Sequence, residues 1–128
     1  MRKNRAANPA DCADTSGFKS LLKRATTEML ILLVLRQGAM YTYEMMNAIK
    51  KMSGDYFTFN TLYIAIYRLK ELLFIEETSK IVSEDNRMRV YFSITEKGCE
   101  YLDNLLDEYN KFSAVIDEFI NYDVKKMS

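Results

Sequence analysis

The chain has 128 residues and a mass of 15.0 kDa, the size of one domain with room for an appended helix. Hydrophobic residues make up 48% and aromatic residues 12%, so a packed core is expected and wholesale disorder is excluded. Eighteen basic and eighteen acidic side chains give a formal net charge of zero, and histidine, the commonest general base and metal ligand, is absent.

Residues 1–17 are polar and contain the only proline, Pro9, so we expect a flexible N-terminal arm. No apolar signal segment follows the first residues, and the longest apolar run, residues 29–35, is far shorter than the roughly 20 residues of a membrane span. Cys12 and Cys99 fit neither a zinc site nor a disulfide framework. We therefore expect a cytoplasmic protein without a membrane segment, a metal or another cofactor.

Charge is distributed unevenly along the chain. Residues 1–24 carry six basic and two acidic side chains, whereas residues 96–122 carry seven acidic and two basic ones. Such a chain can present a positive face to an anionic partner while its other end stays acidic. In the alternative interpretation, the acidic segment is only the solvated face of a helix.

Three helices are predicted in the first part of the chain. The first spans residues 18–36 and ends before Gly38. Its second half is apolar on every side, so it must be covered from more than one direction, by a further element of this chain or of another chain. The second spans residues 43–52. The third spans residues 58–73, with a buried stripe at helical spacing that consists of Leu62, Ala65, Ile66, Leu69 and Leu73.

A β-hairpin and a final helix follow. Residues 74–82 and 88–94 are strand-like, and the second of these segments alternates apolar and polar side chains, with a turn-forming segment between them. Thr95 is the predicted N-cap of a last helix that extends to about residue 122. The order predicts a mainly α fold with a small β-hairpin: a winged helix-turn-helix over residues 18–95, followed by a C-terminal dimerisation helix and tail over residues 96–128.

The sequence offers little for catalysis. The adjacent carboxylates at residues 107–108 and 117–118 lie on one helix, where neighbours point about 100° apart and cannot converge on one substrate. Cys99 has no base beside it, and no glycine-rich phosphate-binding loop is present. We therefore expect a protein that is not an enzyme.

The third helix of a winged helix-turn-helix enters the DNA major groove, and the hairpin, or wing, contacts the backbone or minor groove. On a helical wheel centred on Leu62, the outer face contains Asn60, Ile64, Tyr67 and Glu71, flanked by Tyr63 and Arg68. Alternatively, the tyrosines pack beneath the wing and the wing cations serve only solubility. The residues predicted to contact double-stranded DNA are Thr58, Asn60, Thr61, Tyr63, Tyr67 and Arg68, together with Lys80, Arg87 and Arg89 of the wing.

The last helix has an apolar heptad stripe that is too long for a small domain to cover. We expect this stripe and the first helix to form a homodimer, although it could instead fold back on its own domain. The predicted interface consists of Met29, Leu33, Leu102, Leu105, Tyr109, Phe112, Ile116 and Phe119. A pocket for a small aromatic effector is a weaker hypothesis, since the same residues are more simply interface core; its lining would be Met29, Tyr101, Tyr109 and Phe112.

Four segments together give a resemblance to a known family. They are ATTEMLILLVL from Ala25, YTYEMM from Tyr41, TLYIAIYRLKELLFI from Thr61 and RVYFSITEKGCEYL from Arg89. With these motifs the chain resembles the PadR family of bacterial transcriptional regulators, in particular its small members with a single C-terminal helix. The resemblance covers about residues 21–120.

The resemblance implies a dimer that binds promoter DNA, usually as a repressor, with Tyr63 as a contact to the DNA backbone. It also implies that some members respond to planar or aromatic compounds held between the two winged-helix domains. The chain departs from the family at Thr42 and Leu73, where glycine is usual, and at Ile64, where proline is usual. The predicted function is therefore that of a sequence-specific DNA-binding regulator, and the alternative is a winged-helix protein-interaction module that does not bind DNA.

Overall fold

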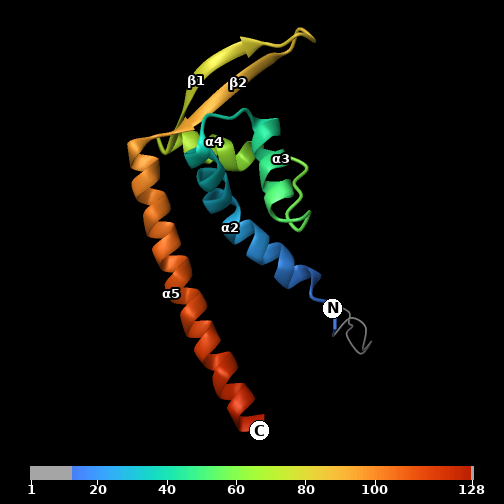
Figure 1. Ribbon diagram of the computed structural model, residues 1–128, viewed down its shortest axis with the longest axis vertical. Coiled ribbons are helices and arrows are strands. Elements are labelled where there is room, and N and C mark those ends of the chain that lie inside the picture. Colours follow the sequence, from blue (N-terminus) through green and yellow to red (C-terminus); the bar gives the residue numbers. More distant parts are fainter. Residues whose placement is uncertain (1–12, 128) are drawn as a thin grey trace, which may run out of the picture.

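The computed structural model describes residues 13–127 of the chain (Figure 1). Most of the predicted N-terminal arm lies outside the described residues. The elements are α2 (Ser16–Gln37), α3 (Thr42–Met52), α4 (Tyr63–Glu71), β1 (Ile75–Val82), β2 (Met88–Ile94) and α5 (Glu96–Met127). This order confirms the predicted mainly α fold with three helices, a hairpin and a long final helix.

The second half of α2 forms the centre of the core. Ile31, Leu32, Val34 and Leu35 are all buried, which explains why this helix is apolar on every side. The surrounding elements of the same chain cover it with the buried side chains Met45, Ile49, Leu62, Ile66, Leu69, Ile75, Phe92 and Leu102. A partner chain is therefore not needed to cover this half of α2.

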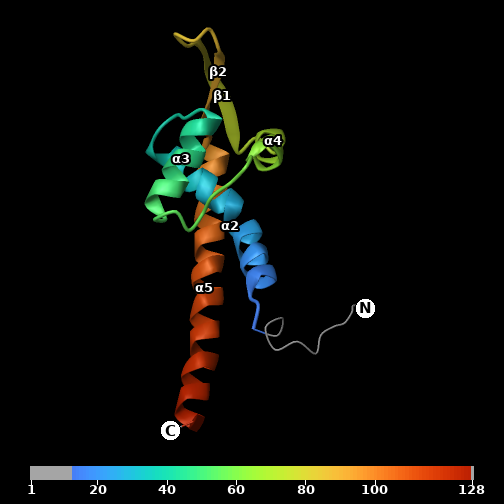
Figure 2. The same cartoon turned by 90° about the vertical axis from the view of Figure 1, so that its right-hand side faces the viewer.

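The hairpin is attached to the helices by a backbone bridge. β1 and β2 pair antiparallel from Ile75 opposite Ile94 to Val82 opposite Met88. Met40, between α2 and α3, exchanges two hydrogen bonds with Phe92, with N–O distances of 3.1 and 2.9 Å. Beyond this bridge the hairpin extends away from the helices as a wing (Figures 1 and 2).

Helix α4 begins later than the sequence pattern predicts. Phe57 and Phe59 are partly buried and their rings stack with centroids 6.2 Å apart, whereas Thr58 and Asn60 between and after them are exposed. Side chains that alternate in this way need an extended backbone. The predicted helix start at residue 58 is therefore wrong, and the helix starts at Tyr63.

The end of α4 also differs from the prediction. The N–H of Phe74 donates to the carbonyl of Leu69 and that of Leu73 donates to the carbonyl of Lys70, at 2.9 and 3.0 Å. These are the two hydrogen bonds of a Schellman cap, which requires a left-handed residue, and Leu73 takes that role with φ 66°. Leu73 is consequently exposed and does not belong to the predicted buried stripe.

Helix α5 has 32 residues, which corresponds to about 48 Å. Its beginning confirms the predicted cap, because the N–H of Gly98 donates to the hydroxyl oxygen of Thr95 at 2.9 Å. The helix first packs against α2 and then continues well past the domain (Figure 2). Within residues 13–127, no helix is long and apolar enough to cross a membrane.

Candidate nucleic-acid interface

Helix α4 has a buried face and a face fully open to solvent. Ile66 and Leu69 point into the core, and Tyr63, Ile64 and Tyr67 on the other side are 73%, 81% and 57% exposed. The tyrosines therefore do not pack beneath the wing, which was the alternative that the sequence left open. The exposed face of α4 therefore presents the aliphatic side chain of Ile64 together with the phenol hydroxyls of Tyr63 and Tyr67.

The loop before α4 adds polar groups to the same end of the helix. Thr58, Asn60 and Thr61 are exposed, but they precede α4 instead of lying on it. The hydroxyl oxygen of Thr61 accepts the N–H of Tyr63 at 3.1 Å, so this side chain satisfies one free backbone donor of the first turn.

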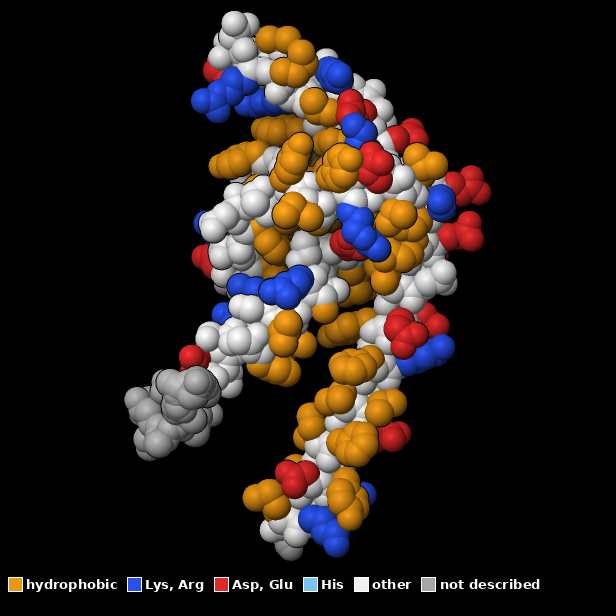
Figure 3. Space-filling view, turned by 180° about the vertical axis from the view of Figure 1, so that it is seen from behind, with side chains coloured by type: hydrophobic (Ala, Val, Ile, Leu, Met, Phe, Trp, Pro, Cys, Tyr) orange, Lys and Arg blue, Asp and Glu red, His pale blue; other side chains and the backbone are white. Residues whose placement is uncertain are grey.

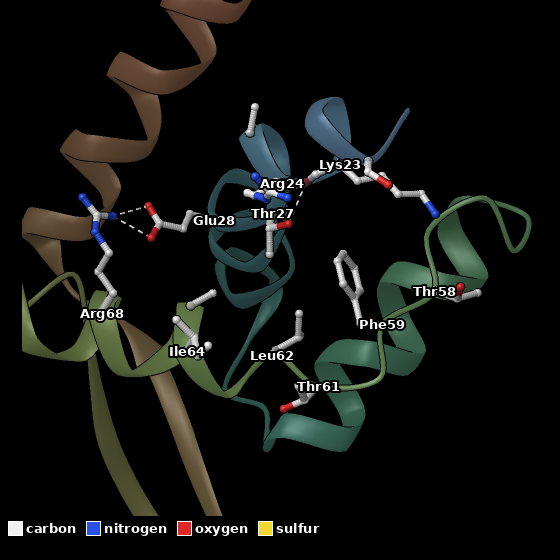
Figure 4. Close-up of a pocket in the computed structure, with 13 residues that line it drawn as sticks. Lys23, Arg24, Thr27, Glu28, Thr58, Phe59, Thr61, Leu62, Ile64 and Arg68 are labelled. Atoms are coloured by element: carbon white, nitrogen blue, oxygen red, sulfur yellow. Dashed lines mark hydrogen bonds and ion pairs between the residues drawn. The ribbon is translucent and has the colours of Figure 1, made fainter. Parts of the chain in front are cut away.

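Arg68 holds α4 against α2. Its Nη1 atom lies 2.5 and 2.6 Å from the two carboxylate oxygens of Glu28 (Figure 4). The Glu28 carboxylate, with a smaller effect of the Tyr101 hydroxyl, raises the pKa of Arg68 above its usual value. In this structure Arg68 therefore makes an intramolecular ion pair, whereas the sequence suggested a contact with DNA.

An open groove of about 570 Å³ runs between α2 and the start of α4 (Figure 4). Its walls combine cationic, acidic and apolar side chains. The lining residues from α2 are Ser20, Lys23, Arg24, Ala25, Thr27 and Glu28, and those from the loop and α4 are Thr58, Phe59, Thr61, Leu62, Ile64, Ala65 and Arg68.

The three predicted wing cations all have neighbours within the protomer. The Lys80 ammonium lies 3.8 Å from the Glu77 carboxylate and Arg87 lies 3.6 Å from Asp85. The guanidinium of Arg89 lies over the ring of Tyr41, 4.7 Å from its centroid. Because the first two pairs are exposed, they are weak and can exchange for other anions.

A second ion pair links α4 to the wing. The ammonium of Lys70 lies 2.5 Å from a carboxylate oxygen of Glu77, and this hydrogen bond lowers the pKa of Glu77 below its ordinary value. Together with the Arg68 pair, it links α4 to the neighbouring elements on both flanks. Sequence periodicity could not show either contact, because the partners lie on different elements.

The end of α4 is joined directly to the start of α5. The carbonyls of Leu73 and Phe74 accept hydrogen bonds from the Thr95 hydroxyl and the Thr95 N–H, at 2.7 and 3.0 Å. The ring of Phe74 stacks on Tyr101 with centroids 4.1 Å apart. A side chain at Gly98 would place its Cβ 2.0 Å from the Phe74 carbonyl oxygen, so the close approach requires glycine.

Beyond this junction, the apolar stripe of α5 divides into two parts. Leu102 is fully buried in the core of its own domain, and Leu105 is packed against that core, so Leu102 is not available to a partner. The rest of the stripe is exposed: Tyr109, Phe112, Ile116 and Phe119 are 41–69% open to solvent. Figure 3 shows hydrophobic side chains gathered along the part of α5 that extends beyond the domain.

The first half of α2 has an apolar face as well, formed by the exposed Phe18, Leu21 and Leu22. Between α2 and α5 lies an open groove of about 340 Å³. Three of the four predicted effector-pocket residues line it, and the fourth, Tyr101, lies elsewhere, against Phe74. The lining consists of Leu22, Ala25, Thr26, Met29, Leu105, Glu108, Tyr109 and Phe112. Leu33, from the predicted interface, packs partly buried against the core.

The winged-helix part of the chain and the final helix differ in net charge. Residues 18–95 carry eleven basic and eight acidic side chains, a net charge of +3, whereas residues 96–128 carry four basic and eight acidic ones, a net charge of −4. The unit that contains α4 and the wing is therefore the cationic part of a chain with no net charge overall.

Three helices followed by a hairpin that extends as a wing define a winged helix-turn-helix, with a long helix appended. Residues 31–104, more than half of the chain, match the family model described as the transcriptional regulator PadR-like family. The chain belongs to this family. The members of this family are transcriptional regulators, so the expectation that the protein is not an enzyme is confirmed.

Solved structures agree with this assignment. A transcriptional regulator from Clostridium thermocellum is 27% identical with a TM-score of 0.68, and the match covers 77% of this chain and 96% of that one. A PadR-like transcriptional regulator from Bacillus cereus is 23% identical with a TM-score of 0.65, covering 78% and 96%. A PadR family regulator from Eggerthella lenta matches 90% of this chain and 94% of its own, with 19% identity and a TM-score of 0.70. The comparison with curated proteins gives no match.

Proposed function

We propose that the protein is a homodimeric, sequence-specific DNA-binding repressor of transcription in which α4 enters the major groove. The observation that carries this proposal is the exposed face of α4, which presents Tyr63, Ile64 and Tyr67 from a helix that Ile66 and Leu69 anchor in the core. Phenol hydroxyls form hydrogen bonds with phosphates and base edges, and winged-helix proteins use this helix to read DNA.

The loop and the wing extend the proposed contact surface. Thr58, Asn60 and Thr61 are exposed at the start of α4, where a recognition helix approaches the bases. Lys80, Arg87 and Arg89 of the wing exchange their intramolecular neighbours for phosphates. Arg68 pairs with Glu28 within the protomer and reaches a phosphate when that exposed ion pair opens.

The exposed apolar faces of α2 and α5 support the proposed dimer. Large apolar patches of this kind mark protein interfaces. The partner's α5 would cover Phe112, Ile116 and Phe119, and two α4 helices about 34 Å apart would then face successive major grooves. Replacing Phe119 with glutamate is expected to give a monomer in sedimentation experiments, whereas the neighbouring Glu118→Gln variant stays dimeric. A monomeric wild-type protein would contradict the proposal.

DNA binding is tested with duplexes selected by the full chain from a random-sequence pool. The Tyr63→Phe and Tyr67→Phe variants each remove one exposed hydroxyl per subunit. Each is expected to weaken binding by roughly 2- to 12-fold per half-site, the range of one hydrogen bond, and therefore by roughly 5- to 150-fold for the dimer on both half-sites. Tyr122→Phe, far along α5, is the control and should bind normally. The affinity should also fall steeply as salt rises, because phosphate contacts release counterions.

The second candidate is a protein-interaction module without DNA binding. It is favoured by a specific observation: of the five cations of α4 and the wing, four lie beside carboxylates, and the fifth, Arg89, lies over the ring of Tyr41. If the wild-type dimer enriches no sequence from the pool and binds no duplex even at low salt, this candidate replaces the first.

We also propose that the groove between α2 and α5 accepts a small aromatic effector. Met29, Tyr109 and Phe112 line it, and the partner subunit of the proposed dimer would close its open side. A ligand that binds only the folded dimer raises its thermal midpoint. A thermal-shift screen of planar aromatic compounds should find stabilising ligands whose effect is lost in Phe112→Ala; a screen without any stabilising compound refutes this part.

A further inference from the structure

Ile64 is an unusual residue for the place it occupies. At 81% exposure it is the most exposed large hydrophobic side chain of residues 13–127, and it is the second residue of α4. It points away from Ile66 and Leu69, which anchor the helix in the core, so packing within the domain does not explain it.

The proposed dimer contact does not explain Ile64 either. The exposed apolar faces of that contact are Phe18, Leu21 and Leu22 of α2 and the extended part of α5. Ile64 belongs to neither face and lines the groove between α2 and the start of α4. On the helix, Ile64 is next to Tyr67 one turn away and adjoins Tyr63 in sequence. The three side chains form one patch that combines an aliphatic group with two phenol hydroxyls.

We infer that Ile64 contacts the C5-methyl group of a thymine and thereby selects an A·T base pair in each half-site. In the major groove, thymine alone of the four bases presents a methyl group, and an aliphatic side chain is its natural partner. The position fits, because residues in the first turns of a recognition helix contact base edges. This inference rests on the proposed DNA-binding function and adds the base that the helix prefers.

Charge around the patch favours DNA over a protein partner. The unit that carries α4 has a net charge of +3, while the acidic surplus lies on α5. Arg87 of the wing is 81% exposed, and its contact with Asp85 is long enough to be exchanged for a phosphate. An exposed aliphatic side chain on a unit that carries exchangeable cations matches a groove whose floor presents methyl groups and whose edges are phosphates.

The test removes the methyl group from the DNA and the aliphatic group from the protein independently. The full-chain dimer first selects duplexes from a random pool. Each thymine of the selected site is then replaced by uracil, which lacks only the C5-methyl, in both half-sites at once. For wild type, one position should lose about 4-fold affinity per half-site, the value of one buried methyl group, and therefore about 16-fold for the duplex.

The Ile64→Ala variant should bind the thymine and uracil versions of that position within 2-fold of each other. Because Ile64 is exposed, this variant is expected to keep its fold, which circular dichroism and thermal melting verify. Ile81→Ala, which removes a half-exposed isoleucine from the wing, is the matched control and should keep the wild-type discrimination. If Ile64→Ala binds too weakly to measure, Ile64→Val must show a smaller discrimination than wild type.

Two results overturn the inference while leaving the proposed function intact: every thymine of the site tolerates uracil, or the Ile64 variants discriminate as strongly as wild type. If the wild-type protein enriches no duplex at all, the proposed DNA-binding function fails and the inference fails with it. The two failures are therefore distinguished by the selection step alone.

Discussion

Leu73 adopts a backbone conformation that normally belongs to glycine, and this gives a sharp prediction. With φ 66° it is the left-handed residue of the cap that ends α4. A side chain with a Cβ costs about 1–2 kcal/mol in this conformation. Because Leu73 is 64% exposed, little burial compensates for the strain. The family resemblance points to the same position, where glycine is usual.

The comparison that isolates this strain is Leu73→Gly against Leu73→Ala, since both variants remove the same leucine atoms beyond Cβ. Glycine avoids about 1–2 kcal/mol of backbone strain in the folded state. Its greater conformational freedom, however, stabilises the unfolded chain by about 0.4–1 kcal/mol. The glycine variant should therefore be more stable than the alanine variant by about 0.5–1 kcal/mol. For a chain of this size the difference corresponds to roughly 2–4 °C in the melting temperature.

Urea unfolding and thermal melting at one fixed protein concentration measure this difference; the concentration matters because a dimer's stability depends on it. Ala114→Gly in α5 is the control, since Ala114 is exposed in a regular helix and the same change of residue type should cost about 1 kcal/mol there. The reasoning is refuted if alanine is the more stable residue at position 73 as well.

Two further predictions concern the supports of α4. Gly98→Ala should destabilise the protein by about 1–3 kcal/mol, because the new Cβ would lie 2.0 Å from the Phe74 carbonyl oxygen. Urea unfolding measures this loss. The control is Glu100→Ala, a change of an exposed residue, which should stay within about 0.5 kcal/mol of wild type. A Gly98→Ala variant as stable as wild type would contradict the close contact. Replacing Arg68 or Glu28 with alanine should lower the free energy of unfolding by less than about 1 kcal/mol, since the Arg68 side chain is 55% exposed. A double-mutant cycle measures the coupling between the two residues. A coupling energy above about 2 kcal/mol would contradict this prediction.

The regular elements followed from the sequence because their causes are local. The strand of residues 88–94 alternates apolar and polar side chains, and the structure has β2 at those residues. The capping role of Thr95 needs only the residues directly after it, and it is confirmed. The stripe at Leu62, Ile66 and Leu69 likewise identified the buried face of α4.

The first and last residues of α4 could not be predicted from the sequence, because tertiary contacts determine them. The start depends on where Phe57 and Phe59 find partners, and their packing keeps the preceding segment extended. The end depends on Leu73 and Phe74, whose carbonyls accept hydrogen bonds from Thr95, more than twenty residues later in the chain. No periodicity within the segment contains this information.

What the sequence by itself determined is which residues of each element are apolar, and hence the fold class; its motifs gave the resemblance to the family. The tertiary structure alone decided how the residues are used. It assigned Arg68 to Glu28, placed Leu102 in the domain core, and left Phe112, Phe119 and Ile64 open to solvent. The physical reason is that hydrophobic periodicity indicates which side chains are buried, whereas the residue that each of them contacts depends on chain segments far away in the sequence.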